Sequence, residues 1–241
     1  VMGGMSRSAQ FFQSRFSMTR AIGAETAHFA DDPPDYPARC AAALASDVGC
    51  PDAAAAERMR AAIRQAKADK DTLGGIIEVV ALGLPPGLGS HVHYDRRLTG
   101  RLAGAVCSVP SIKGAEIGPA FDNARRPGTQ VHDRLALDEE GNIRRTSNRA
   151  GGLEGGMTTG EPLVVRAAMK PISTTLTPLE SVNLATGALA PTEYERSDFC
   201  ATPRAVVILE AAVAFVLADE LLRKLGGDSL EVVGDLQDLI V

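Results

Sequence analysis

The chain has 241 residues, of which 45% are hydrophobic but only 4% aromatic, and it contains no Trp, so its core must consist mainly of Ala, Val, Leu and Ile. Its formal net charge of −5 argues against a nucleic-acid partner, because proteins that bind nucleic acids carry a basic surface that neutralises phosphates. The cysteines are widely spaced without a CxxC pair, a pattern typical of reduced thiols in a cytoplasmic protein: Cys40, Cys50, Cys107 and Cys200.

Residues 1–36 are predicted to be a leader that is separate from the main domain at residues 37–241. Pro and Asp cluster between residues 31 and 37, and such a segment cannot form a regular helix or strand. The first 24 residues contain three Arg, several Ser and no acidic residue, which is the composition of an organellar transit peptide. A truncated or mis-joined end would have the same composition.

Helix and strand patterns alternate along the rest of the chain. One segment is rich in Ala and in charges of both signs, lacks Gly and Pro, and has apolar positions at helical spacing. Others are short, β-rich and bounded by turn residues, which is typical of strands. The patterns predict helices over residues 53–70, 95–108 and 203–226, and strands over residues 76–82 and 162–170. Helices separated by single strands and hairpins predict an α+β fold.

The longest apolar stretch, residues 205–218, is interrupted by Glu210. It is too short to span a bilayer, which requires ~20 apolar residues. We therefore expect a core helix there and no membrane partner.

Two histidine motifs could carry chemistry. His91 and His93 would point to one face of a strand and could bind a metal there, but no third ligand is evident and zinc needs three or four. An ordinary pair of histidines is the simpler interpretation, so no metal site is predicted. His132 and Asp133 lie in an arginine-rich stretch, residues 118–152, that we expect to be a long loop or hairpin. Asp133 could orient His132 as a base if the fold brings the two side chains together.

Glycines cluster between residues 151 and 160. Because they leave little side chain over the backbone, the amides of this segment could bind a phosphate or a flavin ring. The same residues would also be needed in a tight turn with positive φ. The sequence pattern alone leaves both interpretations open.

Lys170 is followed by Pro, Ile and two hydroxyl residues, Ser173 and Thr174, at the end of a predicted strand. A cation and two hydroxyls in this position can hold a phosphate through charge and hydrogen bonds. An exposed strand end with ordinary polar residues is the alternative.

Asp198 lies between two guanidinium groups, those of Arg196 and Arg204, just before the last predicted helix. A carboxylate in this setting could accept or relay a proton, and the start of a helix favours an anionic ligand. A structural ion pair or a helix cap would show the same pattern.

The run from Pro37 to about Leu230 resembles the C-terminal part of the chorismate synthases. The motif Arg196-Ser197-Asp198-Phe199-Cys200, followed at the family's spacing by Glu210-Ala211, matches a family signature except that Phe199 replaces a Pro or small residue. Four further blocks match: DTLGGIIEV from Asp71, GLGSHVHYDRRL from Gly87, IKGAEIG from Ile112, and RTSNRAGGLEGGMTTGEPLVVRAAMKPIST from Arg145.

Two N-terminal motifs of the family are absent, one of the Gly-Glu-Ser-His-Gly type and one of the Arg-Pro-Gly-His type. They supply the family's catalytic histidines, so neither His91 nor His132 inherits that role. We expect the chain to be a truncated copy of the family or a fragment joined to a foreign leader.

The resemblance implies which residues form the site. Asp198 would lie near the flavin N5 and assist its proton transfer. The implied flavin contacts are Pro110, Ser111, Gly155, Lys170, Pro171, Ile172, Ser173, Thr174 and Arg196. Basic residues that could supply part of the field around an anionic substrate are Lys113, Arg149, Arg166, Lys170 and Arg196.

The resemblance also implies a fold, an assembly and a reaction. The fold would be α+β, with helices sandwiched between antiparallel β-sheets, assembled as a cytoplasmic homotetramer. The reaction would be elimination of phosphate from 5-enolpyruvylshikimate 3-phosphate to give chorismate, with reduced FMN as cofactor. The alternative is a non-catalytic, flavin-binding fragment, since loss of a general acid lowers a rate by roughly 10²- to 10⁴-fold.

Overall fold

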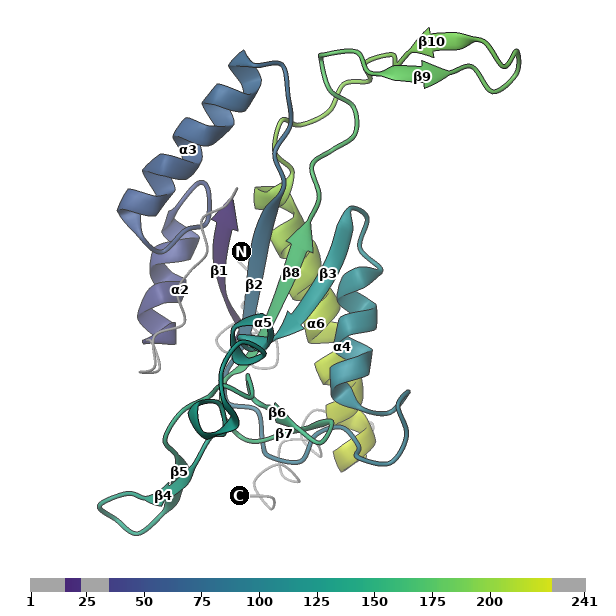
Figure 1. The fold of residues 1–241 in the computed structure, drawn as a ribbon. Helices are drawn as coiled ribbons and strands as arrows, with labels where there is room; N and C mark the ends of the chain where they lie inside the picture. Colours follow the sequence, from purple (N-terminus) through teal and green to yellow (C-terminus); the bar gives the residue numbers. More distant parts are fainter. Residues whose placement is uncertain (1–15, 23–34, 227–241) are drawn as a thin grey trace, which may run out of the picture.

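A four-stranded antiparallel sheet lies at the centre of the computed structural model, which describes residues 16–22 and 35–226 (Figure 1). Its strands are β1 (Phe16–Ile22), β2 (Gly75–Ala81), β8 (Leu163–Met169) and β3 (Ile112–Ile117), in that order across the sheet. β2 and β8 are the central strands and pair with each other over their full lengths. The strands predicted over residues 76–82 and 162–170 are thereby confirmed.

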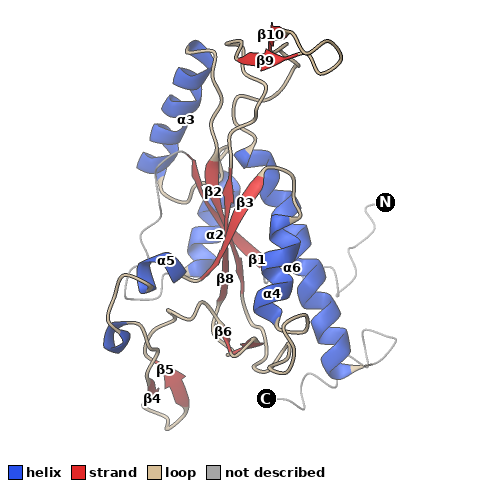
Figure 2. Ribbon diagram, turned by 45° about the vertical axis from the view of Figure 1, so that its right-hand side comes forward, coloured by secondary structure: helices blue, strands red, loops and turns tan. Residues whose placement is uncertain are grey.

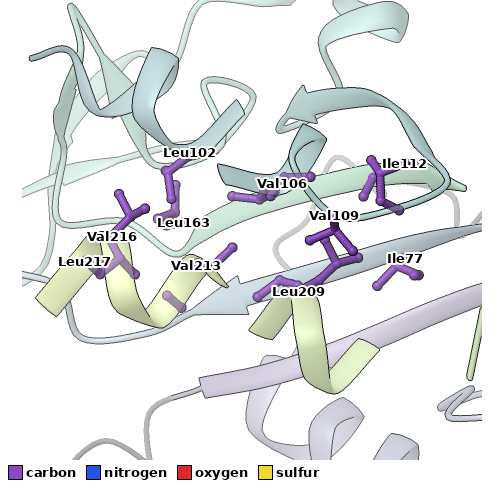
Figure 3. Close-up of a cluster of buried hydrophobic side chains, with 14 of the residues drawn as sticks. Ile77, Leu102, Val106, Val109, Ile112, Leu163, Leu209, Val213, Val216 and Leu217 are labelled. Carbon is purple, nitrogen blue, oxygen red and sulfur yellow. The ribbon is translucent and has the colours of Figure 1, made fainter. Parts of the chain in front are cut away.

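Two helices, α4 (Leu98–Cys107) and α6 (Thr202–Leu225), cover one face of this sheet (Figure 2). Alternate residues of the strands point toward them, as the two-residue period of a strand requires. Figure 3 shows the resulting core, which contains Ile77, Leu102, Val106, Val109, Ile112, Leu163, Leu209, Val213, Val216 and Leu217. Each such side chain, when fully buried, contributes roughly 1.5–3 kcal/mol. This face therefore holds the main hydrophobic core.

Ion pairs join α4 to α6 at the edge of that core. Arg101 of α4 donates to the carboxylates of Asp219 and Glu220 on α6. α6 ends at Leu225, where Gly226 takes a φ of +73° that favours glycine. The helix predicted over residues 203–226 and the one predicted over 95–108 are confirmed, although α4 begins only at Leu98.

The opposite face of the sheet carries α2 (Tyr36–Ala45) and α3 (Ala53–Ala68). Tyr36 packs with Val80 and Val164, which point away from α4 and α6. Both helices begin at an aspartate cap: the Asp35 carboxylate accepts from the Ala38 amide at 3.0 Å. The Asp52 carboxylate caps the start of α3 in the same way. The helix predicted over residues 53–70 is confirmed and ends two residues earlier, where Lys70 adopts a φ of +58°.

A row of charged side chains crosses the middle of this second face. Glu78 of β2, Arg166 of β8 and Glu116 of β3 lie directly opposite one another in the register of the three strands. Arg166 Nη1 is 2.6 Å from Glu116 Oε2, and its Nε is 3.7 Å from Glu78 Oε2. We call these residues the Glu78–Arg166–Glu116 row.

Short elements extend from both ends of the sheet (Figure 1). Residues 118–152, predicted to be a long loop or hairpin, form a hairpin with short helical turns before it, which confirms that prediction. The short elements are α5 (Ala120–Asn123), a 3₁₀ turn (Gly128–Gln130), β4 (Leu135–Leu137), β5 (Ile143–Arg145), β6 (Leu153–Glu154), β7 (Met157–Thr158), β9 (Glu180–Val182) and β10 (Leu189–Pro191). The β9–β10 hairpin lies at the opposite end of the molecule from the other two.

Helices on both faces of an antiparallel sheet confirm the predicted α+β class. The outer side of α6 exposes a series of apolar side chains: Val207, Ile208, Phe215 and Leu222. No helix in the described part of the chain is long and apolar enough to cross a membrane.

Strand β1 lies inside the segment that the sequence analysis assigns to a leader. It pairs with β2 over seven residues, from Phe16 opposite Ala81 to Ile22 opposite Gly75. The other residues of the predicted leader are outside the described part of the chain. The boundary at residue 37 stays a prediction.

Candidate cofactor site at one end of the sheet

The C-terminal end of β8 meets the N-terminal end of β3, because these strands are antiparallel neighbours. The Lys170 amide donates to the Ser111 carbonyl at 2.9 Å. Ser111 adopts a φ of +69°, which is unusual for a residue with a side chain. Pro110, Ser111 and Lys170, which were predicted as separate flavin contacts, therefore lie together at one end of the sheet.

The segment from Lys170 to Thr174 is fixed from two sides. Thr72, which precedes β2, donates from its hydroxyl to the Ile172 carbonyl at 2.6 Å. The hydroxyls of Thr174 and Ser197 are 2.8 Å apart. These contacts bring the predicted phosphate-binding segment to the segment that carries Asp198.

Asp198 lies next to the start of α6 and pairs with Arg204 in its first turn. The distance from Asp198 Oδ2 to Arg204 Nη1 is 3.0 Å, and the side chains are 39% and 80% exposed. Arg196 is exposed as well. Among the described residues Asp198 forms an ion pair with Arg204 but not with Arg196, so one of the two predicted guanidinium partners is in place.

Phe199, the residue that departs from the family signature, contacts the segment before β2 and lies near α3. Its carbonyl accepts from the Leu73 amide at 2.8 Å, and its ring lies 6.0 Å from the Lys67 ammonium of α3. Contacts therefore fix the segment on both sides of Asp198: the Thr174 and Ser197 hydroxyls hydrogen-bond, and the backbone of Leu73 pairs with that of Phe199 and Cys200.

Gly155 lies at the other end of β8, in the turn between β6 and β7 (Figure 1). This hairpin packs against the start of α4, where the Leu98 amide donates to the Gly156 carbonyl at 2.9 Å. Seven residues of β8 separate the two ends of the sheet by roughly 20 Å. The structure therefore does not bring Gly155 together with Lys170 and Asp198 within this chain.

The glycine cluster has the backbone that a tight turn requires. Gly155 has a φ of +61°, and a Cβ at Gly152 would lie 2.7 Å from the Cα of Leu163. Nothing in the described residues lies within 4 Å of a Cβ built on Gly155, so the space above it is open. A turn explains the conformation, and the open space at Gly155 is compatible with a contact from outside.

Comparison with known proteins shows to which family the chain belongs. The family model described as chorismate synthase matches residues 14–222. The chain belongs to the chorismate synthase family. A crystal structure titled as that of a chorismate synthase superimposes with a TM-score of 0.77 at 38% identity, covering 93% of this chain and 62% of that chain.

Curated chorismate synthases are similar at higher identity. The protein from Trichlorobacter lovleyi is 54% identical over 205 residues, which make up 82% of this chain and 52% of that protein. The one from Chlorobaculum tepidum is 58% identical over 170 residues, 70% of this chain and 43% of that protein. The chain spans about half the length of the curated relatives it matches.

The two histidine motifs lie apart from the candidate site. His91 and His93 are exposed in a loop before α4, and not on a strand. No group of three or more metal-ligating side chains is found in the described residues. Asp133 accepts from the Ser147 hydroxyl and from the amides of Arg149 and Ala150, so its carboxylate holds two segments together.

Two of the five cations expected to act on an anionic substrate are paired with acids of this chain. Arg166 lies between Glu78 and Glu116, and Arg149 is 3.0 Å from Asp122. Their charges are thereby offset within the fold. The other three cations, Lys113, Lys170 and Arg196, are exposed.

A pocket of about 390 Å³, not indicated by the sequence patterns, lies at the base of the β4–β5 hairpin. Its lining consists of Arg126, Thr129, Gln130, His132, Arg134, Thr146, Ser147 and Arg149. The high density of arginine between residues 118 and 152 is the sequence feature that could have indicated this pocket. The two halves of the lining meet only after the hairpin forms, so sequence spacing could not show the pocket.

Proposed function

We propose that this chain carries the cofactor end of a chorismate synthase, which eliminates phosphate from 5-enolpyruvylshikimate 3-phosphate to give chorismate with reduced FMN. The family match over residues 14–222 carries the proposal. The curated relatives named chorismate synthase support the same reaction class, that of a carbon–oxygen lyase acting on a phosphate ester. In this reaction a phosphate and a proton leave the substrate, and no net oxidation occurs.

The residues at the end of the sheet fit an anionic cofactor. Lys170 is exposed and supplies an ammonium group, and Ser173 and Thr174 supply hydroxyls beside it. The segment is anchored through the Ile172 carbonyl and the Thr174 hydroxyl, so its donors are held in place before any ligand arrives. We propose that residues 170–174 hold the phosphate of FMN and that Pro110, Ser111 and Arg196 contact its remainder.

Reduced FMN, when bound, supplies electron density as the phosphate of the substrate departs and recovers it as the proton leaves. Asp198 is the proposed proton-handling group, because its half-exposed carboxylate can accept or pass a proton at an oxygen atom. Arg204 orients that carboxylate from the first turn of α6. Lys113 is an exposed cation on β3, the strand that begins at this end of the sheet, and we propose that it attracts the anionic substrate.

Gly155 requires a separate account, because it lies at the far end of β8. We propose that it contacts the flavin of a neighbouring copy in a homotetramer. Exposed apolar side chains on the projecting hairpins support such an association, since they would be buried between copies: Leu135, Leu137, Ile143, Leu179, Val182, Leu184 and Leu189. We propose a cytoplasmic location for the assembly.

The test is anaerobic formation of chorismate by the purified chain with its substrate and chemically reduced FMN, beside a full-length relative as control. Asp198→Ala should lower turnover by roughly 10²- to 10⁴-fold. Lys170→Gln should weaken FMN binding and leave the Asp198 step intact at saturating cofactor. Absence of turnover with Lys170-dependent FMN binding would favour the non-catalytic flavin-binding fragment, and absence of FMN binding would overturn the proposal.

A further inference from the structure

The pocket at the base of the β4–β5 hairpin is lined by cations and hydrogen-bond donors. Three guanidinium groups, those of Arg126, Arg134 and Arg149, line it together with an imidazole and the hydroxyls of Thr129, Thr146 and Ser147. Its lining contains no carboxylate. A volume of about 390 Å³ lies within the range of pockets that hold small molecules, roughly 300–1,000 Å³.

Asp122, which is outside the lining, holds two of the guanidinium groups in place, those of Arg126 and Arg149. Its Oδ2 is 3.0 Å from Arg149 Nη1 and 2.9 Å from Arg126 Nε. Hydrogen bonding from Arg149 is the main cause that lowers the pKa of Asp122 below its usual value, so this carboxylate is an anion under ordinary conditions. Asp122 does not line the pocket, so it fixes two cations without filling the space in front of them.

The backbone of the pocket is fixed in the same way. The Asp133 carboxylate accepts from the amides of Arg149 and Ala150 at 2.7 and 2.8 Å. The Thr146 amide donates to the Arg134 carbonyl at 2.9 Å and closes the base of the hairpin. Contacts within the chain therefore fix the backbone of the site, which lowers the entropic cost of binding.

Arg134 differs from the other two arginines, because its side chain has no ion-pair or hydrogen-bond partner among the described residues. Asp122 offsets one of the three positive charges of the lining, so the concave site keeps a surplus of positive charge, to which Arg134 contributes. Guanidinium forks and hydroxyls match the oxygens of a phosphate group in charge and geometry.

We propose that this pocket binds a phosphate group, either as inorganic phosphate or as part of a small phosphate ester. The pocket is lined by residues at the base of the β4–β5 hairpin. Figure 1 shows this hairpin at the same end of the sheet as the β6–β7 hairpin that carries Gly155, opposite the end of β8 that leads to Lys170. The pocket is therefore a second anion site, distinct from the flavin phosphate site proposed above. The ligand is either inorganic phosphate or a carboxylated ester such as phosphoenolpyruvate, which share the same phosphate chemistry.

The test is isothermal titration calorimetry of the full chain with inorganic phosphate and with phosphoenolpyruvate at low ionic strength. Loss of one charge-assisted contact in Arg134→Gln should weaken binding by about 10- to 100-fold. Arg134→Lys keeps the charge without the fork and should retain part of the affinity. Arg144→Gln is the matched control, because it removes the same charge from the same hairpin outside the lining and should change affinity less than about twofold.

Tighter binding of phosphoenolpyruvate than of inorganic phosphate would identify the ligand as an ester, and equal binding would identify it as phosphate alone. Equal weakening by Arg134→Gln and Arg144→Gln, or no saturable binding of either probe, would overturn the proposal. Displacement of the bound probe by one equivalent of FMN would also overturn it, because the two anion sites would then be one. Lys170→Gln should leave probe binding unchanged, so the proposal for this pocket can be tested separately from the proposed flavin site.

Discussion

The two faces of the central sheet are built on different physical principles. The face toward α4 and α6 is apolar along β2, β8 and β3, with Leu163, Val165 and Ala167 of β8 buried against the helices. The face toward α2 and α3 carries the Glu78–Arg166–Glu116 row, and Glu78 is only 6% exposed. The face toward α4 and α6 stabilises the fold through the apolar area that it removes from water. The face toward α2 and α3 combines a smaller apolar cluster with charges that must be paired.

The difference bears on strand register. Apolar contacts are non-directional, so the helical face would tolerate a slip of two residues, which keeps the same side chains on that face. Such a slip would leave Arg166 on its own face but move it away from both carboxylates. The charged row therefore selects the register of β2, β8 and β3, whereas the helical face supplies most of the stability.

Removal of Arg166 is expected to have the largest effect on stability. Arg166→Leu leaves the carboxylates of Glu78 and Glu116 in a mostly buried setting without their shared cation. Breaking a buried pair in this way costs roughly 3–5 kcal/mol. Urea unfolding of the variant at neutral pH measures the loss of unfolding free energy.

A triple variant, in which Glu78, Arg166 and Glu116 all become Leu, separates charge from packing. If the row selects register and adds little net stability, the triple variant should recover most of the loss seen in Arg166→Leu. A triple variant that is less stable than Arg166→Leu would show that the row itself stabilises the sheet.

Truncation on the helical face should cost somewhat less. Leu209 of α6 is fully buried, and Leu209→Ala is expected to destabilise by about 2–5 kcal/mol, through lost burial and the cavity left behind. Phe215→Ala on the same helix is the matched control, because Phe215 is 76% exposed. Thermal unfolding of both variants checks this, and equal losses would mean that the outer side of α6 is covered in solution.

Tyr36 gives the α2 face a pH-dependent stability. Burial, with a smaller contribution from the Glu78 charge, raises the pKa of Tyr36 to about 12 from its usual value near 10. Because the folded pKa is the higher one, the stabilisation is fully present below pH ~10 and is lost between about pH 10 and 12. The loss amounts to about 2–3 kcal/mol.

Tyr36→Phe removes the titrating group and keeps the ring in contact with Val80 and Val164. The difference in urea midpoint between the wild type and this variant should therefore change as the pH rises above 10. Titration of all other groups affects both proteins equally and cancels in this difference. A difference that is constant across this range would contradict the assignment to Tyr36.

Local patterns in the sequence were sufficient for the helices and the central strands. The helix predicted over residues 53–70 follows from apolar spacing, which is a local feature, and the structure adds a local cap at Asp52. The clustering of Lys170 with Pro110 and Ser111 could be expected only from the family resemblance. Its physical basis is the pairing of β8 with β3, which joins residues about 60 positions apart.

Features that depend on distant partners could not be predicted. Arg166 was expected to act on a substrate, but its two carboxylate partners come from neighbouring strands whose pairing the sequence does not reveal. The anion pocket depends on contacts between Asp122 and Arg149 across 27 positions. Gly155 was grouped with Lys170 by resemblance alone, and the β6–β7 turn places it at the far end of β8.

The smallest expected stability effect concerns Arg204, and it decides how the Asp198 pair is interpreted. Both side chains are substantially exposed, so Arg204→Gln should lower the unfolding free energy by only about 0–1 kcal/mol. If Arg204 positions the carboxylate for proton transfer, the variant should nevertheless lower turnover at saturating FMN and shift its pH profile. Arg64→Gln, which breaks an equally exposed pair with Glu57 on α3, is the control. Because a merely structural pair predicts the same small change for both variants, a turnover defect confined to Arg204→Gln would assign the pair to function.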